Sequence, residues 1–311
     1  MAEPAYVKLL ESGDLARRAH AAWDMLRACA VCPRACGVDR TAGERGVCGA
    51  GADPCVSSHN SHPGEEPPLS GTRGSGTIFL THCNLACVFC QNYPISQLGN
   101  GNEVSCERLA GMMLSLQQRG CHNINFVTPT HYMPQILKGI LLAATRGLRV
   151  PIVWNCGGYE SVQALELLHG VVDIYLPDAK YGCDENAEKF SGAPGYTAVN
   201  RAALKEMYRQ VGGLSLDGHG VAERGLIIRH LVLPGDIART RDVFAFIAAE
   251  LGADVYLSIM DQYFPAHRAA SVPALSRPIS PREYQAALDA AEEFGLDRGW
   301  IQGGGDCADE I

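Results

Sequence analysis

The sequence predicts an α/β protein, a partial (β/α)6 TIM-like barrel that follows a small N-terminal cysteine-rich extension. The first observation is a repeat: from residue 76, six short runs of β-branched and aromatic residues alternate with amphipathic stretches. Strands that alternate with helices imply right-handed βαβ units and a parallel sheet. The second observation is that four cysteines lie within residues 29–48, before the repeat begins. The third is that an unusual polar motif follows each of the six runs.

The expected elements follow in chain order. A helix is expected over 13–28, where Leu15, Ala19 and Leu26 share one face. The expected strands cover 77–81, 123–128, 151–155, 171–176, 226–233 and 254–259. Helical patterns lie near 106–119, 133–147, 160–169, 196–211, 240–251 and 281–295. Ser280 and Glu283 form a capping box at the start of the last helix. No long linker follows residue 76, so we predict an extension over 1–75 and one barrel domain over 76–311.

Composition narrows the class of protein. The chain has 311 residues, 47% hydrophobic and 19% charged, which is ordinary for a globular protein. A net charge of −8 without a Lys/Arg-rich run argues against a nucleic-acid partner. No apolar run is long enough for a membrane span, and residues 1–20 lack the apolar region of a signal peptide. We therefore expect a cytoplasmic protein whose 13 cysteines are metal ligands and core thiols.

Three cysteines follow the first expected strand. Cys83, Cys87 and Cys90 have the spacing C-x3-C-x2-C, with Phe89 before the last. Cysteine thiolates ligate iron–sulfur clusters, and one loop with close spacing can wrap a [4Fe–4S] cluster. Three thiolates leave the fourth iron open to a small molecule. The alternatives are a zinc site or three structural thiols, although zinc usually takes four ligands from two separated pairs.

A second group of cysteines forms a knuckle in the extension. Cys29, Cys32, Cys36 and Cys48 have the spacing C-x2-C-x3-C-x11-C, with Gly and Pro between them. Such a group could hold zinc or a second iron–sulfur cluster, or its thiols could be unligated. Cys55 could replace one ligand.

Residues 53–76 are expected to be a loop, because Pro67, Pro68, Gly71, Gly74 and Gly76 interrupt any regular element. Glu65 and Glu66 lie in this segment, near His59 and His62. The paired carboxylates could bind a substrate amine or a metal, or they could belong to a solvated linker. We predict that they contact the substrate or a partner.

The polar motifs at the strand ends should meet at one rim. In parallel barrels the carboxyl ends of the strands carry the chemistry. The motifs at the carboxyl ends of the six expected strands are, in order, the cysteine loop, 128–132, 154–159, 177–181, 229–236 and 260–265. Convergence of six such motifs favours a binding site over simple turn chemistry.

These motifs resemble those of radical S-adenosylmethionine (SAM) enzymes. The cysteine loop matches the signature of that superfamily. The chain is also similar to the branch that resembles pyruvate formate-lyase-activating enzyme, through CPRACGVDR, GEEPPLSG, CNLACVFCQNYPIS, VTPTHY, WNCGGYES, DIYLPDAKY and RHLVLPGD. The resemblance covers nearly the whole chain and implies a barrel of the radical SAM type.

The resemblance also implies cofactors and roles. It implies a [4Fe–4S] cluster on Cys83, Cys87 and Cys90, with SAM on the open iron and Phe89 near the adenine. Strand 2 of most relatives ends in Gly-Gly-Glu, which receives the SAM amino group; here Thr128 and Thr130 stand at that strand end. The other matched polar positions near SAM are Asn155, Asp178, Lys180, Arg229 and His230.

The resemblance leaves several functions open. The first is an activating oxidoreductase that uses a 5′-deoxyadenosyl radical to take hydrogen from a glycine of a partner enzyme, with a reductant such as flavodoxin or ferredoxin. The second is the same chemistry on a small molecule or another peptide. The third, from another class, is a zinc-binding module without catalysis.

Overall fold

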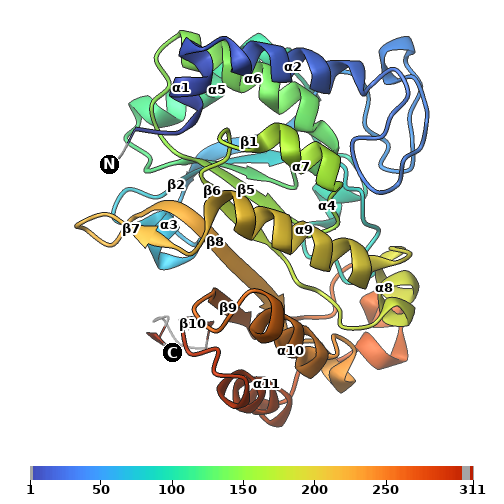
Figure 1. Cartoon of the computed structure of the whole chain (residues 1–311). Helices are drawn as coiled ribbons and strands as arrows, with labels where there is room; N and C mark the ends of the chain where they lie inside the picture. Colours follow the sequence, from blue (N-terminus) through green and yellow to red (C-terminus); the bar gives the residue numbers. More distant parts are fainter. Residues whose placement is uncertain (1–2, 303–308, 311) are drawn as a thin grey trace.

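The computed structural model describes residues 3–302 and 309–310, and it shows a curved sheet covered on its outer side by helices (Figure 1). Seven neighbouring strands in these residues run parallel: β2 (Ser75–Leu80), β4 (Ile124–Val127), β5 (Ile152–Cys156), β6 (Ile174–Pro177), β8 (Ala222–Leu231), β9 (Tyr256–Met260) and β10 (Gly299–Gln302). The first six are the predicted strands, with ends shifted by one to four residues. The α/β class with a parallel sheet is confirmed, and β10 adds one strand that the sequence pattern did not reveal.

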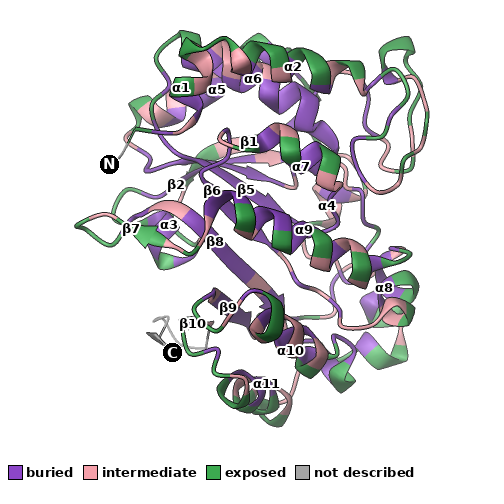
Figure 2. Ribbon diagram, in the orientation of Figure 1, coloured by how far each residue is buried: buried purple, intermediate pink, exposed green. Residues whose placement is uncertain are grey.

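Helices connect the parallel strands and cover the outer face of the sheet. They are α5 (Cys106–Gln118), α6 (Met133–Thr145), α7 (Val162–Leu168), α9 (Tyr196–Val211), α10 (Thr240–Glu250) and α11 (Pro281–Glu293), each where the sequence pattern predicted one. Their buried sides face the sheet and their exposed sides face outward (Figure 2). The predicted capping box of α11 is present: Ser280 Oγ accepts from the Glu283 N–H, and the Glu283 carboxylate accepts from the Ser280 N–H at 2.7 Å.

The extension begins with two helices that pack against α6, α1 (Tyr6–Glu11) and α2 (Asp14–Asp24). The helix predicted over 13–28 therefore ends four residues early, and α1 was missed. A short helical turn, η1 (Arg40–Ala42), lies in the cysteine knuckle.

The prediction of a loop over 53–76 is wrong for much of that segment. Strand β1 (Cys55–His62) pairs antiparallel with β2 and carries the short strand β3 (Asn102–Glu103) on its other side. Its Ser, His and Asn residues have low strand propensity, but pairing satisfies the backbone groups at the open edge of β2. Helix α3 (Pro67–Ser70) follows, with Pro67 at its first position, where a missing N–H costs nothing.

The remaining short elements complete the described chain. They are α4 (Tyr93–Ser96), α8 (Asp184–Ser191), β7 (Ser215–Leu216), β11 (Asp309–Glu310), η2 (Thr130–Tyr132), η3 (Pro234–Asp236), η4 (Ala269–Ser271) and η5 (Pro273–Leu275). Strand β7 pairs with β8, and β11 pairs with β10.

Two hydrophobic cores lie on opposite faces of the sheet, because successive side chains of each strand point in opposite directions. Ile228 and its outward-facing neighbours pack under the helices in the main hydrophobic core. Ile227 faces the other way and packs with Val153, Ile174 and Leu69 of α3 on the inner side of the sheet. Successive side chains of a strand point to opposite faces, so this alternation also decides which polar residues face the barrel interior.

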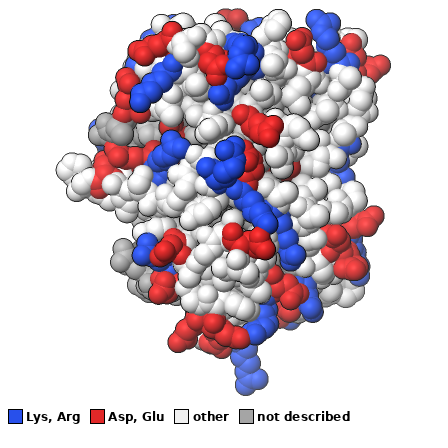
Figure 3. All heavy atoms as spheres, viewed as in Figure 1, with Lys and Arg blue, Asp and Glu red and all other residues white. Residues whose placement is uncertain are grey.

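Two surface properties bear on the class of protein. Within the described residues no helix is long and apolar enough to cross a bilayer. On the face shown in Figure 3, acidic and basic side chains are interspersed.

Candidate functional site

The three loop cysteines line one pocket at the carboxyl ends of the parallel strands. Cys83, Cys87 and Cys90 surround a cavity of about 150 Å³. The loop that carries them is tied to the end of α8, because the Ala86 N–H donates to Ser191 O at 2.9 Å and the Val88 N–H to Phe190 O at 2.8 Å. The tertiary structure therefore holds all three sulfurs on the wall of one cavity.

Each of the three sulfurs has a polar neighbour. The Leu85 N–H donates to Cys83 Sγ at 3.3 Å and the Ser191 hydroxyl donates to Cys87 Sγ at 2.9 Å. Cys90 Sγ and Ser96 Oγ are 3.1 Å apart. Burial raises the pKa of the Cys83 and Cys87 thiols, so they are neutral unless a metal binds them. Donors aimed at sulfur are the surroundings that a thiolate-bound iron–sulfur cluster requires, so this donor set fits such a cluster.

The other side of the same pocket is polar and charged. Thr128, Asn155, Asp178, Lys180 and Arg229 all line it. Lys180 Nζ lies 2.5 Å from Asp178 Oδ2. Burial would raise the pKa of Asp178, but the Lys180 and Arg229 charges hold it below its usual value, so this carboxylate is ionised. The structure therefore brings five of the predicted SAM contacts together with the three cysteines.

Phe89 lies in the same cavity lining and is almost fully buried. Its ring meets that of Tyr263 edge to face, with centroids 6.0 Å apart. Thr128 has a left-handed backbone (φ 60°), and its N–H donates to Asn155 O at 2.9 Å. A β-branched residue is strained there, and such strain is concentrated at functional sites.

Two predicted contacts lie elsewhere. His230 does not face the pocket: Nδ1 donates to Ala179 O at 2.7 Å, Nε2 lies 2.9 Å from Thr240 Oγ1, and burial lowers the pKa of His230 to about 4. It follows Arg229 in β8, and strand alternation turns it toward α10. The Thr130 hydroxyl donates to the buried carboxyl of Glu160, so it does not line the pocket either.

Glu65 and Glu66 are buried on the inner side of the sheet, so the alternative of a solvated linker does not hold. Their side chains are 8% and 2% exposed. Glu65 Oε2 lies 3.6 Å from Arg229 Nη1, and Glu66 Oε1 lies 3.9 Å from Arg229 Nε. Burial raises the pKa of Glu65 to about 7, against the opposing effect of Arg229. Neither carboxylate lines the pocket itself, but both contact the arginine that does.

The four knuckle cysteines lie next to the cluster loop. Arg34 Nε donates to Asn84 O at 2.9 Å, and a cavity of about 290 Å³ lies between Cys48 and Cys83. Burial raises the pKa of Cys32 to about 12, and the nearby Cys48 and Cys29 add to the shift.

A fully buried arginine anchors this segment to the barrel. Arg40 donates to Gly51 O at 2.6 Å and to His131 O at 2.7 Å. Cys55 lies apart from the four cysteines of the knuckle. It is in β1, beside Tyr132. In the described part of the chain, no group of three or more His, Cys, Asp or Glu side chains is spaced to hold a single metal ion.

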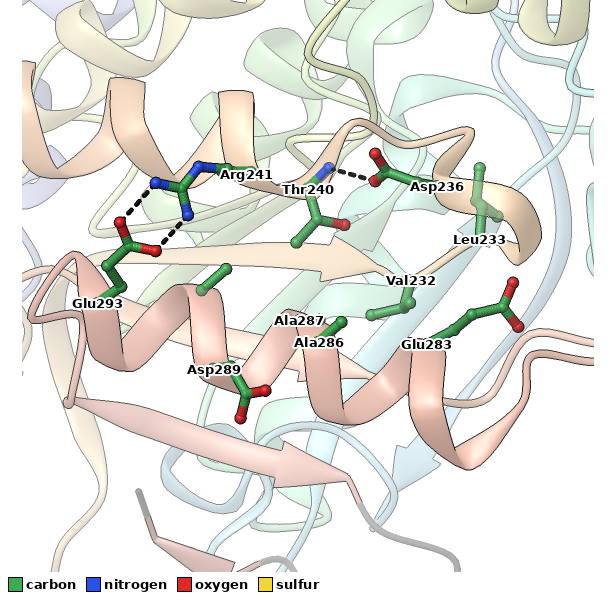
Figure 4. Close-up of a pocket in the computed structure, with 11 residues that line it drawn as sticks. Val232, Leu233, Asp236, Thr240, Arg241, Glu283, Ala286, Ala287, Asp289 and Glu293 are labelled. Carbon is green, nitrogen blue, oxygen red and sulfur yellow. Dashed lines mark hydrogen bonds and ion pairs between the residues drawn. The ribbon is translucent and has the colours of Figure 1, made fainter.

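A larger cavity, of about 460 Å³, lies away from the cysteines between α10 and α11 (Figure 4). Alanine side chains of α11 line it, and Arg241 pairs with Glu293 at one end. The carboxylates around it are Asp236, Glu283, Asp289 and Glu293. The part of its lining that the structure describes contains no cysteine, and its one arginine is paired with Glu293. The smaller pocket, which the three cysteines line, is therefore the candidate for the chemistry.

Sequence reasoning missed several polar residues of the barrel interior. Asn125 and Ser258 are fully buried within β4 and β9, and Ser191 bonds to Cys87 from α8. The signal for the first two was in the sequence: a polar residue inside an otherwise apolar strand must face a polar interior or lack a partner. Ser191 carried no such signal, because only the tertiary structure brings α8 to the cysteine loop.

Comparisons with known proteins agree with this arrangement. The profile described as "Radical SAM superfamily" matches residues 77–220. The uncharacterized protein MJ0674 of Methanocaldococcus jannaschii is 31% identical over 286 residues, which is 88% of this chain and 77% of that protein.

The similarity extends to solved structures. HydG, a maturase of the [FeFe]-hydrogenase, matches with a TM-score of 0.50 and 10% identity, over 72% of this chain and 50% of its own. SuiB of Streptococcus suis matches with a TM-score of 0.49 and 10% identity, over 72% of this chain and 47% of its own. This chain thus spans about half the length of both proteins. At such low identity the match to HydG shows the fold alone.

Proposed function

Because this chain belongs to the radical SAM superfamily, we propose that it cleaves SAM reductively and uses the resulting radical to abstract hydrogen from a substrate at the rim of the barrel. Membership of the superfamily implies an enzyme with a [4Fe–4S] cluster and SAM as cofactors. One observation carries the proposal: Cys83, Cys87 and Cys90 share a single pocket with Asp178, Lys180 and Arg229.

The residues of the pocket divide into two sets. Cys83, Cys87 and Cys90 would hold the cluster, which when bound supplies the electron that splits the sulfonium of SAM into methionine and a 5′-deoxyadenosyl radical. The polar wall would bind the nucleoside and amino-acid parts of SAM. Lys180 is held by Asp178, and a fixed ammonium can orient an anionic group. Phe89, which lines the pocket and packs against Tyr263, would form an apolar part of the wall that keeps water from the radical.

The experiment is anaerobic reconstitution followed by incubation with SAM and dithionite. We expect 5′-deoxyadenosine from the wild type and at least a hundredfold less from Cys83→Ala, Cys87→Ala or Cys90→Ala, because three thiolates are the full ligand set of the cluster. Cys183→Ala is the matched control, since this partly exposed thiol does not line the pocket. Full product from any of the three loop variants would refute the assignment. A colourless protein that binds only zinc would support the non-catalytic alternative.

The activating-enzyme reaction, hydrogen abstraction from a glycine of a partner enzyme, is one candidate for the substrate. Three of the exposed large hydrophobic side chains in the described residues support a macromolecular partner: Val47, Leu98 and Phe264 are 69%, 62% and 51% exposed. They lie in the knuckle and in the loops that follow α4 and β9, around the mouth of the barrel. Exposed apolar groups around a site are typical of protein-binding surfaces. The required electron would come from a reductant such as flavodoxin or ferredoxin.

A small molecule or another peptide is the second candidate, supported by the charged side chains buried beside the pocket. Deuterium transfer distinguishes the two. A peptide deuterated at glycine Cα should label 5′-deoxyadenosine under the first candidate, and the label should be absent under the second.

We further propose that Cys29, Cys32, Cys36 and Cys48 bind a second metal centre, either zinc, around which the four thiols would have to draw together, or an iron–sulfur cluster. Their mutual proximity supports this, since Cys29 and Cys48 each raise the pKa of Cys32. Without a metal, four neighbouring thiols, two buried and two half-buried, would contribute little to the stability of a Gly- and Pro-rich segment.

A further inference from the structure

A buried polar layer lies on the inner side of the sheet, next to the pocket. Asp178, Arg229 and Ser258 are neighbours in this layer, because Asp178 bridges to Arg229 and Arg229 is in register with Ser258. Glu65 and Glu66 reach the same arginine from the segment before α3. Helix α3, which follows that segment, is held to the sheet, since Asn123 Nδ2 donates to Leu69 O at 2.9 Å.

The layer is unusual because several of its buried polar atoms make no hydrogen bond. Among the described residues, buried side-chain atoms without a hydrogen bond include Glu66 Oε2, Asp178 Oδ1, Ser258 Oγ, Arg229 Nε and Asn125 Oδ1, although Arg229 Nε and Asp178 Oδ1 form an ion pair 3.4 Å apart. The Asn125 side chain is directed at Glu65, whose pKa it lowers, and it is fully buried. A buried polar atom without a partner costs about 1–3 kcal/mol. Three of these atoms, Glu66 Oε2, Asn125 Oδ1 and Ser258 Oγ, have no ion pair of their own either, which indicates that a polar group normally lies against them.

The charges of the layer indicate which group this is. Its carboxylates are Glu65, Glu66 and Asp178, and its cations are Lys180 and Arg229, so three negative charges face two positive ones. Arg229 is shared among three carboxylates at 3.4, 3.6 and 3.9 Å and makes a close hydrogen bond to none of them. With all three carboxylates ionised the layer is one positive charge short; burial and the neighbouring Glu66 raise the pKa of Glu65 to about 7, so either a proton on Glu65 or a bound cation can supply that charge.

We propose that this layer binds the primary ammonium group of the substrate. An ammonium has one positive charge and three N–H donors, and the layer with its three carboxylates ionised has a deficit of one charge and three unpartnered acceptors outside the Lys180 pair: Glu66 Oε2, Asn125 Oδ1 and Ser258 Oγ. Arg229 Nε, which makes no close hydrogen bond, fits an oxygen adjacent to the amine. The layer adjoins the pocket, because Asp178 and Arg229 belong to the layer and also line the pocket. The assignment rests on the proposed radical SAM function and adds to it a substrate class: primary amines with a neighbouring carbonyl or carboxyl oxygen.

The test measures binding and needs no turnover. Anaerobically reconstituted protein is saturated with SAM, left unreduced, and titrated by ligand-detected NMR with glycinamide or with glycolamide, in which a hydroxyl replaces the ammonium. We expect glycinamide to bind at least tenfold more tightly than glycolamide. Glu66→Gln should remove that preference, and Ser258→Ala, which changes no charge, should weaken glycinamide binding about threefold. Glu292→Gln, on the exposed face of α11, is the matched control and should bind like the wild type.

Three results would overturn the proposal. The first is equal binding of the two probes to the wild type. The second is displacement of glycinamide by an equal concentration of potassium chloride, which would make the layer a site for an inorganic cation. The third is loss of SAM affinity in Glu66→Gln, which would assign the layer to the ammonium of SAM itself. Failure of the proposed function is seen separately, as absence of 5′-deoxyadenosine after reduction of wild-type protein that still prefers glycinamide.

Discussion

Replacement of Arg229 by methionine should destabilise the fold through the charges it leaves behind. The side chain of Arg229 is the shared partner of Glu65, Glu66 and Asp178, and all three carboxylates are at least four-fifths buried. Methionine fills a similar volume and removes the charge. The variant therefore isolates the electrostatic role of the arginine from its packing.

The magnitude follows from the distances. At separations of 3.4–3.9 Å and an effective dielectric constant of about 20, each pair attracts by about 4–5 kcal/mol before desolvation is subtracted. Removal of one partner from a buried pair costs about 3–5 kcal/mol in the free energy of unfolding, because a buried charge is left unpaired. The variant can relieve part of this cost by protonating Glu65, whose pKa is already raised to about 7. We therefore expect about 3–5 kcal/mol at pH 8 and a smaller loss at pH 6.

The assay is urea denaturation followed by circular dichroism, with wild type and variants at equal cluster loading. Arg241→Met is the matched control, since Arg241 pairs with Glu293 at an exposed position and should cost under about 1 kcal/mol. Adding Glu66→Gln to Arg229→Met should recover at least about 1 kcal/mol, because the two residues interact directly. A loss below about 1 kcal/mol for Arg229→Met, or additive effects in the double variant, would refute the reasoning.

Two further predictions concern stability and metal content. Burial raises the pKa of Asp173 from 3.8 to about 6, so the native state holds this proton more tightly than the unfolded state. The free energy of unfolding of the wild type should fall relative to Asp173→Asn by up to about 3 kcal/mol as the pH rises from 4 to 6, and parallel pH profiles in urea would contradict this. Replacing all four knuckle cysteines by alanine should remove one metal centre, measured as zinc or iron per chain, while the cluster on Cys83, Cys87 and Cys90 remains. Unchanged zinc and iron content would show that the knuckle thiols bind no metal.

The periodic part of the fold was predictable because it depends on local patterns. The six predicted strands and the helices between them are present, and α9 has the predicted bounds. Alternating apolar runs and a capping box act within a few residues of one another, so a single sequence reveals them. Strand β1 was missed because its polar residues form a strand only when the edge of β2 is available to pair with.

The residues of the candidate site also divide into those that local sequence patterns predicted and those that only the tertiary structure placed. The cysteine spacing predicted a cluster loop, and the polar strand ends predicted a rim, since both are short-range signals. Sequence could not tell that His230 faces α10 while its neighbour Arg229 faces the pocket, because a one-residue change in register exchanges the two faces of a strand.

What the sequence by itself determined is therefore the chemistry available: three closely spaced thiolates, a parallel barrel and a set of charged residues at strand ends. Only the tertiary structure decided which of these residues meet. Glu65 and Glu66 lie more than 160 positions from Arg229 in the chain, in a segment whose composition suggested a solvated linker. They contact it because α3 packs Leu69 against the inner face of the sheet and carries the two carboxylates into the interior. Burial in that interior, and not residue type, then raises the pKa of Glu65.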